Sequence, residues 1–243
     1  MTGTILNVAT VLVGSVLGTL LGNRLPDKVR ETVVHGLGLT TLVIGLSLAL
    51  KTQNILIALA SILLGGISGE LLGIEAALER LGRWLEARSS RLQLPGSAGT
   101  ANSASSTANF VRGFLTASLL FCVGPMTIMG SIQDGLTGDF TLLAIKSTMD
   151  GFAALAFASS LGWGVAFSAL TVLFYQGGIT LGAGWLKAAL TDPMINEMTA
   201  VGGILMLGIA LGLLEIKRLR VGNLLPALFI APLIVALAAW LRR

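Results

Sequence analysis

Apolar residues along this chain fall into long runs that polar residues interrupt only briefly. Eight runs approach the ~20 residues that a helix needs to cross the hydrocarbon core of a bilayer. They cover residues 3–22, 33–50, 54–73, 109–130, 141–161, 164–186, 199–215 and 222–240. The fifth and sixth runs are separated only by LGWG, so seven crossings are the alternative. The pattern predicts an all-α polytopic membrane protein with a single membrane domain over residues 1–243.

Composition agrees with this class and narrows the range of partners. Hydrophobic residues make up 54% of the chain and charged residues 12%, whereas soluble domains are about 25% charged. Basic residues form no run with interleaved aromatics, so we expect no nucleic-acid partner. Because Cys122 and His35 are each the single residue of their type, a Cys/His metal cluster is excluded. We expect a bilayer as partner, no enzyme activity and no cofactor beyond a small cation such as Na⁺; a homo-oligomer is compatible with the sequence.

One long polar segment, residues 74–108, interrupts the apolar runs. Its first part, IEAALERLGRWLEARSSRL, places apolar residues on one helical face and predicts an amphipathic helix on the membrane surface. Its second part, PGSAGTANSASSTAN, is small and polar and predicts a flexible linker. A plain connector is the favoured interpretation, because such composition cannot build a core. A regulatory tether is the alternative.

Lysine and arginine gather in three loops of an eight-helix arrangement: the first, the third and the seventh. The opposite loops hold only Lys51 and Lys187, although Arg242 and Arg243 end the chain on the opposite side. Basic loops usually face the cytoplasm. We therefore expect cytoplasmic basic loops, with both termini outside, in a bacterial inner membrane.

The first and last thirds of the chain carry a degenerate repeat. TLVIGLSLAL at 41–50 resembles ILMLGIALGL at 204–213, and Gly14 and Gly18 match Gly178 and Gly182. Corresponding helices of the two copies are five helices apart along the chain, an odd number, so the copies would insert in opposite directions. The basic loop also changes place between the copies, as inversion requires. The sequence predicts inverted repeats, 1–73 and 163–243, flanking a central helix pair at 109–162; chance similarity between Gly/Leu-rich helices is the alternative. Inverted repeats are typical of secondary transporters.

The central stretch FCVGPMTIMGSIQDGLTGDF contains an apolar segment that proline disrupts. Proline lacks the N–H of a regular helix, so a broken or re-entrant helix would leave carbonyl oxygens free. Together with hydroxyl and carboxylate oxygens these could bind a hard cation. The residues predicted to form this site are Gly124, Pro125, Thr127, Ser131, Gln133 and Asp134. A kinked helix that ends in an ordinary polar loop is the equally weighted alternative.

Four more polar residues lie within apolar runs. Lys146 and Asp150 stand at i and i+4, a spacing that lets them pair on one helical face. Charges at this depth are costly and should face the protein interior or water. We predict a cation-linked switch in which Asp150 binds the ion and Lys146 competes, with a structural ion pair as the alternative. Asn7 and Gln176 predict interhelical hydrogen bonds, and Gln176 is included in the predicted translocation site.

Other residues have expected structural roles. Glu197 is expected to cap the helix that begins near residue 199. Two glycine series allow close helix approach at small-xxx-small spacing. They are Gly14, Gly18 and Gly22, and Gly65, Gly69 and Gly73.

Several motifs together resemble a known family. GTILNVATVLVGSVLG, CVGPMTIMGSIQDGLTGD with KSTMDG, and FYQGGITL are similar to the YdfK/YqgA family of bacterial inner-membrane proteins. The resemblance covers nearly the whole chain apart from the linker, and the central motif is its specific part. It implies a multi-pass protein of a group without assigned function, in places labelled a sodium channel or pump. It carries over no catalytic residues.

Two functions of different classes follow from these observations. The leading hypothesis is a transporter or channel for a small monovalent cation, Na⁺ or H⁺, with its site at the broken fourth helix and the fifth helix. The alternative is a membrane scaffold or sensor that acts through helix packing and the basic surface helix.

Overall fold

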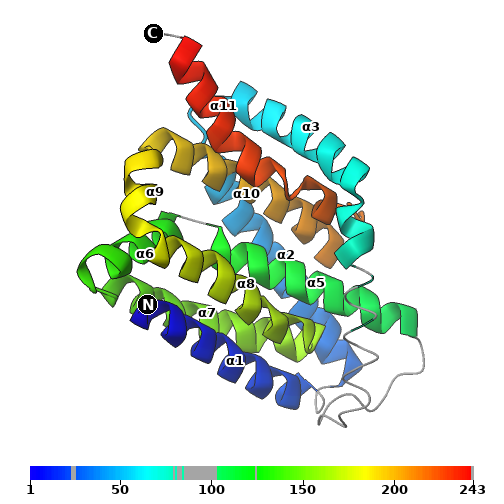
Figure 1. Ribbon diagram of the computed structural model, residues 1–243. Helices are drawn as coiled ribbons and strands as arrows, with labels where there is room; N and C mark the ends of the chain where they lie inside the picture. The colour runs from blue at the N-terminus through cyan, green and yellow to red at the C-terminus, as the bar shows by residue number, and fades with distance from the viewer. Residues whose placement is uncertain (23–25, 79, 81–83, 85–102, 124, 242–243) are drawn as a thin grey trace.

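The computed structural model describes residues 1–241 except 23–25, 79, 81–83, 85–102 and 124, and no strand occurs in these ranges. Helices dominate (Figure 1). Their bounds are α1 Thr2–Gly22, α2 Asp27–Ala49, α3 Ile55–Leu72, α5 Ser103–Cys122, α6 Pro125–Thr137, α7 Thr141–Leu161, α8 Gly164–Leu181, α9 Ala183–Ala189, α10 Asp192–Leu213, the 3₁₀ turn η2 Val221–Leu224 and α11 Ala227–Leu241.

The predicted crossings are confirmed in number. Seven of the described helices are long and apolar enough to cross a membrane, and there are eight spans if the bent pair α5–α6 is counted as one span. The two halves of that pair meet at an angle of 59°, so the break predicted next to Pro125 is present. α7 and α8 are separate helices, because Gly162 between them has a φ of +73°, a left-handed conformation that interrupts the helix.

Several predicted boundaries were wrong by a few residues. α2 begins directly after Pro26, which is its N-cap residue. α10 begins at Asp192–Pro193, because proline is well suited to the first turn of a helix. α5 begins at Ser103, inside the segment predicted as linker. The sixth crossing ends at Leu181 and is followed by the separate helix α9. Of the predicted surface helix, residues 74–78 are helical, and most of the remainder lies outside the described residues.

Contacts between helices divide them into two groups. The first group, named here the polar bundle, contains α1, α5, α6, α7, α8 and α9, and α1 and α7 form its lower edge in Figure 1. The second group, the outer bundle, contains α2, α3, α10, η2 and α11, and α3 and α11 form its upper edge in Figure 1. Contacts between the bundles are made mainly by α2 with α7 and by α10 with α5 and α6. α10 has the largest share of buried residues among the candidate spans, whereas α2, α3 and α11 have the smallest shares.

Glycines bring α1 against α7, as predicted. Gly14, Gly18 and Gly22 contact the backbone carbonyl oxygens of α7 so closely that a Cβ would overlap them. In the outer bundle, a Cβ added at Gly65 would overlap Ala227, and one added at Gly69 would overlap the carbonyl oxygen of Asn223. Gly73 has a different role from the one predicted. Its φ of +63° ends α3, and nothing lies near enough to pack on it.

Carboxylates connect both ends of α3 to α10 and η2. At its start, the Glu197 side chain accepts hydrogen bonds from the Thr52 hydroxyl at 2.7 Å and from the N–H groups of Gln53 and Asn54 at 2.6 and 2.9 Å. Glu197 therefore caps the entry to α3 and not its own helix, which corrects the prediction. Past the other end of α3, Glu75 accepts from the Gly222 N–H at 2.7 Å.

Candidate functional site

The charged pair on α7 lies inside the polar bundle. The Lys146 ammonium donates to Asp150 Oδ2 across one helical turn. Lys146 is 7% exposed and Asp150 6% exposed. The i, i+4 pairing predicted from the sequence is confirmed, and both charges face the interior of the protein.

Two amides connect this pair to the neighbouring helices. Asn7 of α1 donates from Nδ2 to Asp150 Oδ2 at 2.9 Å and to Gln176 Oε1 of α8 at 2.9 Å. Both Asn7 and Gln176 are fully buried. Their predicted interhelical hydrogen bonds are confirmed, and α1, α7 and α8 meet at one polar centre.

Two hydroxyls extend this centre toward the start of α1. Gln176 Nε2 donates to Thr4 Oγ1 at 3.3 Å, and the hydroxyls of Thr4 and Thr180 lie 3.3 Å apart. Neither threonine was identified from the sequence. Thr4 is three residues before Asn7 and Thr180 is four after Gln176, so helical spacing from each predicted amide is the signal that indicates them.

Asp134 of α6 contacts the start of α1. Its Oδ2 accepts from the Gly3 N–H at 3.2 Å and lies 3.0 Å from the ammonium of Met1. The Asp134 side chain is 1% exposed. Asp134 does not touch Asp150, but Gly3, Thr4 and Asn7 form a continuous edge of α1 between the two carboxylates. We name this set of residues the polar network: Asp134, Thr4, Thr180, Gln176, Asn7, Asp150 and Lys146, with Asp134 connected to α1 through the Gly3 N–H.

The other predicted site residues of the central stretch lie outside this network. The Thr127 hydroxyl donates to the Phe121 carbonyl oxygen at 3.0 Å, so it satisfies an oxygen that the break between α5 and α6 leaves without a helical partner. Gln133 is exposed and donates to Asp139 Oδ2 at 2.8 Å. Pro125 begins α6, and Gly124 lies outside the described residues.

Ser131, also on α6, is fully buried, and its hydroxyl has no hydrogen-bond partner among the described residues.

Asp139, in the loop before α7, differs from the network carboxylates. It is exposed and accepts from the Thr141 N–H at 3.0 Å. That backbone hydrogen bond, the Thr141 hydroxyl and the Gln133 amide together hold the pKa of Asp139 below its ordinary value. Asp139 is therefore an ordinary ionised carboxylate at the start of a helix.

One acceptor atom inside the network is unused. Asn7 Oδ1 is buried and has no hydrogen-bond partner among the described residues. The amide cannot be reversed without cost, because Oδ1 would then face the Asp150 carboxylate. A buried acceptor without a donor is unfavourable, and a cation or a water molecule would satisfy it. In the described part of the chain no three His, Cys, Asp or Glu side chains gather as metal ligands, so any ion held here would be bound by a mixture of carboxylate, amide and hydroxyl oxygens.

The fold and this network define a multi-pass helical membrane protein with a buried charged site. The chain belongs to the DUF554 family: the family model described as "Protein of unknown function (DUF554)" matches residues 2–236. This confirms the resemblance seen in the sequence motifs.

Two curated relatives match nearly end to end. The chain is 30% identical over 241 residues to the "Uncharacterized membrane protein YdfK" of Bacillus subtilis (strain 168), covering 97% of this chain and 96% of the relative. It is 33% identical over 239 residues to the "Uncharacterized protein YqgA" of Escherichia coli (strain K12), covering 98% of both. No solved structure matches the chain.

Proposed function

We propose that this protein transports or conducts a small monovalent cation, Na⁺ or H⁺, through the polar network. The observation that carries the proposal is the buried Lys146–Asp150 pair with the unused Asn7 Oδ1 beside it. Ionisable residues inside membrane-spanning helices are costly and typically mark ion or proton pathways. A structural ion pair alone would not need an adjacent free acceptor.

Charge balance suggests how binding would work. The network holds two carboxylates, Asp134 and Asp150, and each already has an ammonium partner. An entering cation therefore has to replace an ammonium group. At Asp150 this requires Lys146 to move away or to lose its proton, and the cation would take its place between Asp150 Oδ2 and Asn7 Oδ1. Exchange of this kind couples the ion to the protonation or position of one lysine.

The arrangement of helices is consistent with two inverted copies around this site. The helices matched by the sequence repeat pack in pairs: α1 on α8, α2 on α10 and α3 on α11. In transporters built this way the ion site lies near mid-membrane where the repeats meet. We further propose a bacterial inner membrane, with the basic loops in the cytoplasm and both termini outside, from the distribution of lysine and arginine.

Cation flux in proteoliposomes tests the proposal. Purified protein is reconstituted, a Na⁺ or a pH gradient is imposed, and uptake is followed for the wild type, Asp150→Asn and Asp139→Asn. The last variant is the matched control, because it makes the same change at an exposed carboxylate outside the network. We expect flux in the wild type and in Asp139→Asn and its loss in Asp150→Asn. Absence of flux for any monovalent cation would refute the proposal and favour the scaffold function; unchanged flux in Asp150→Asn would refute the site.

A further inference from the structure

An apolar cavity of about 280 Å³ lies between the polar bundle and the outer bundle. Residues of α5, α8 and α11 form much of its wall, among them Phe114, Leu119, Cys122, Tyr175, Leu228 and Phe229. The few hydroxyls in the wall include Ser118 and Thr171, which bond to each other at 3.0 Å. The wall therefore offers a ligand hydrocarbon surface and almost no hydrogen-bonding groups.

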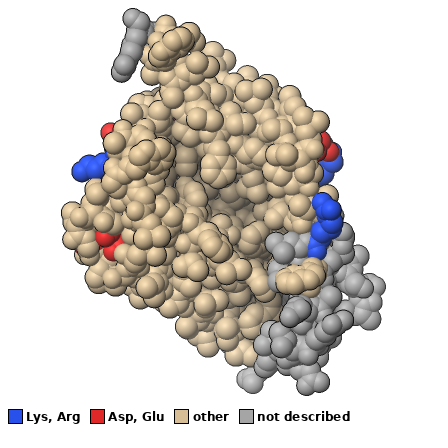
Figure 2. Space-filling model, in the orientation of Figure 1, with Lys and Arg blue, Asp and Glu red and all other residues tan. Residues whose placement is uncertain are grey.

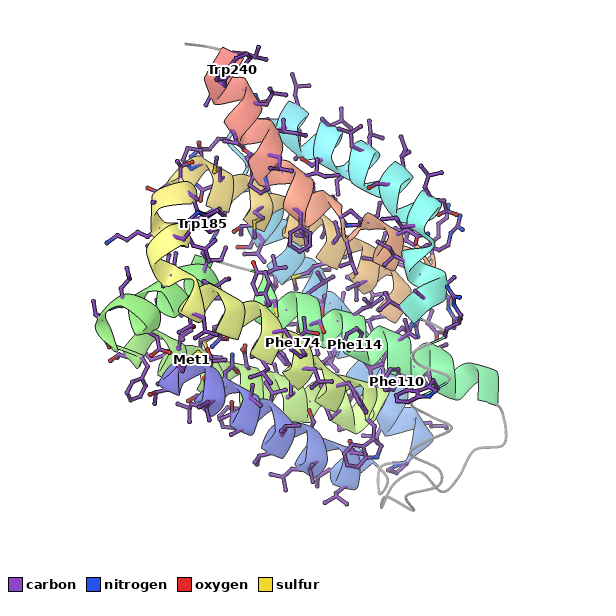
Figure 3. All side chains as sticks on the ribbon, in the orientation of Figure 1. Met1, Phe110, Phe114, Phe174, Trp185 and Trp240 are labelled. Carbon is purple, nitrogen blue, oxygen red and sulfur yellow. The ribbon has the colours of Figure 1, made fainter. Side chains whose placement is uncertain are left out.

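The cavity opens on the side of the helix bundle, about midway along the length of the helices. Figure 2 shows this face hollowed near its centre, with charged side chains only close to two opposite edges. The helices run between those edges in the same orientation (Figure 1). Phe229 of α11 is 64% exposed and also lines the cavity, so it lies at the rim. Phe114 on the wall and Phe174, 74% exposed on the surface, are labelled beside each other in Figure 3.

The surrounding medium at this position is the interior of the bilayer. A charge-free belt between two charged edges is the part of a membrane protein that contacts lipid chains. Apolar cavities of about 150 Å³ already stay dry and bind small hydrocarbons, and this one is larger. Its wall atoms lose dispersion contacts unless something apolar fills the space. The molecules at its mouth are lipid acyl chains.

We propose that the cavity takes up an acyl chain of a membrane phospholipid, inserted between the two bundles. The chain would contact Cys122 at the end of α5 and Ile128 in α6, the two helices that meet at the break. It would also contact Tyr175, next to Gln176 of the polar network. The bound lipid is therefore placed to stabilise the relative position of the bundles. This inference does not depend on cation transport.

Photo-crosslinking in lipid nanodiscs tests it. The full chain is reconstituted with phosphatidylcholine that carries a diazirine within one acyl chain, irradiated and mapped by peptide mass spectrometry. We expect adducts on Leu119 and Cys122, which are 3% and 6% exposed and unreachable from the outer surface. Leu228→Trp should fill the cavity and remove these adducts. Leu233→Trp, the same change at a 66% exposed site of the same helix, should leave them in place.

Two results would overturn the inference. One is labelling spread over the lipid-facing surfaces of α3 and α11 without adducts on Leu119 or Cys122. The other is equal labelling of those two residues in Leu228→Trp and Leu233→Trp. If Leu228→Trp does not fold, as judged by helical content and elution of a single species, Leu119→Phe fills the cavity from the opposite wall and the adduct on Cys122 is the readout.

Discussion

The ion pair on α7 makes a sharp prediction about stability. Removing one partner of a buried pair leaves the other charge uncompensated and costs about 3–5 kcal/mol. After Lys146→Met, the Asn7 Nδ2 donor at 2.9 Å is the one side-chain partner that Asp150 keeps among the described residues. After Asp150→Leu, the Lys146 ammonium loses the only acidic residue of α7, whereas Asn7 keeps its hydrogen bond to Gln176. Because charged side chains in membranes can reach water or thin the bilayer, the lower end, about 3 kcal/mol for each variant, is the better expectation.

The double variant Lys146→Met/Asp150→Leu should behave differently. Replacing a whole buried pair with apolar groups of similar volume is often neutral or stabilising. Simple addition of the two single losses gives about 6 kcal/mol, whereas we expect the double variant within about 1 kcal/mol of the wild type. The large difference measures the coupling between the two side chains.

Equilibrium unfolding in mixed micelles provides the assay. A denaturing detergent replaces a mild one stepwise while helical content is followed by circular dichroism, for the wild type, both single variants and the double variant. Lys187→Met, at an exposed site of α9, is the control and should change stability by no more than about 0.5 kcal/mol. Single losses below about 1 kcal/mol that simply add in the double variant would show that the pair is solvated, and the reasoning would be refuted.

Three further predictions concern other parts of the molecule. Gly18→Ala should destabilise the protein by about 1–3 kcal/mol, because the added methyl group overlaps a carbonyl oxygen of α7. Gly36→Ala is the control and should not destabilise it, because there is open space around Gly36. Equal unfolding midpoints for the two variants would contradict the close packing of α1 on α7. Glu197→Gln should cost about 1.5–3 kcal/mol in detergent unfolding, because charge-assisted bonds to the entry of α3 are lost. The pKa of Asp139 is lower in the folded protein than in the unfolded chain, where it is about 3.9. The ionised Asp139 therefore stabilises the fold above that unfolded pKa, and this stabilisation is lost as the pH falls through the folded-state pKa. The unfolding temperature of Asp139→Asn should therefore fall below that of the wild type near pH 7 and converge with it in acid; a gap that widens in acid would contradict this.

The sequence predicted the parts of the site that depend on local spacing. Lys146 and Asp150 are four residues apart on one helix, so periodicity alone brings them together. The contacts of Asn7 with Asp150 and Gln176 join residues that are 143 and 169 positions apart. The periodicity of one helix cannot show which residues of distant helices lie beside it. The sequence therefore indicated only that each buried amide needs a hydrogen-bond partner.

The neighbours Gln133 and Asp134 show a second limit. Both were included in the predicted site, but successive residues of a helix point about 100° apart. Beyond the 59° bend from α5, α6 has its own rotation about its axis. This rotation turns Asp134 toward α1 and leaves Gln133 exposed. Proline predicted that a break exists, whereas its angle depends on packing between distant helices.

The predicted repeat also shows where the two halves of the molecule differ. The matches of Gly14 with Gly178 and Gly18 with Gly182 both give an offset of 164 residues, which pairs Asn7 with Thr171. Each of these two residues makes a polar contact with a central helix: Asn7 with Asp150 on α7, and Thr171 with Ser118 on α5. The first contact is charged and belongs to the polar network, whereas the second is neutral and lines the apolar cavity. If α1 and α8 are the two copies that the repeat predicts, they would use equivalent positions for different chemistry, and the protein would have the proposed cation site on one side of its centre and the proposed lipid site on the other.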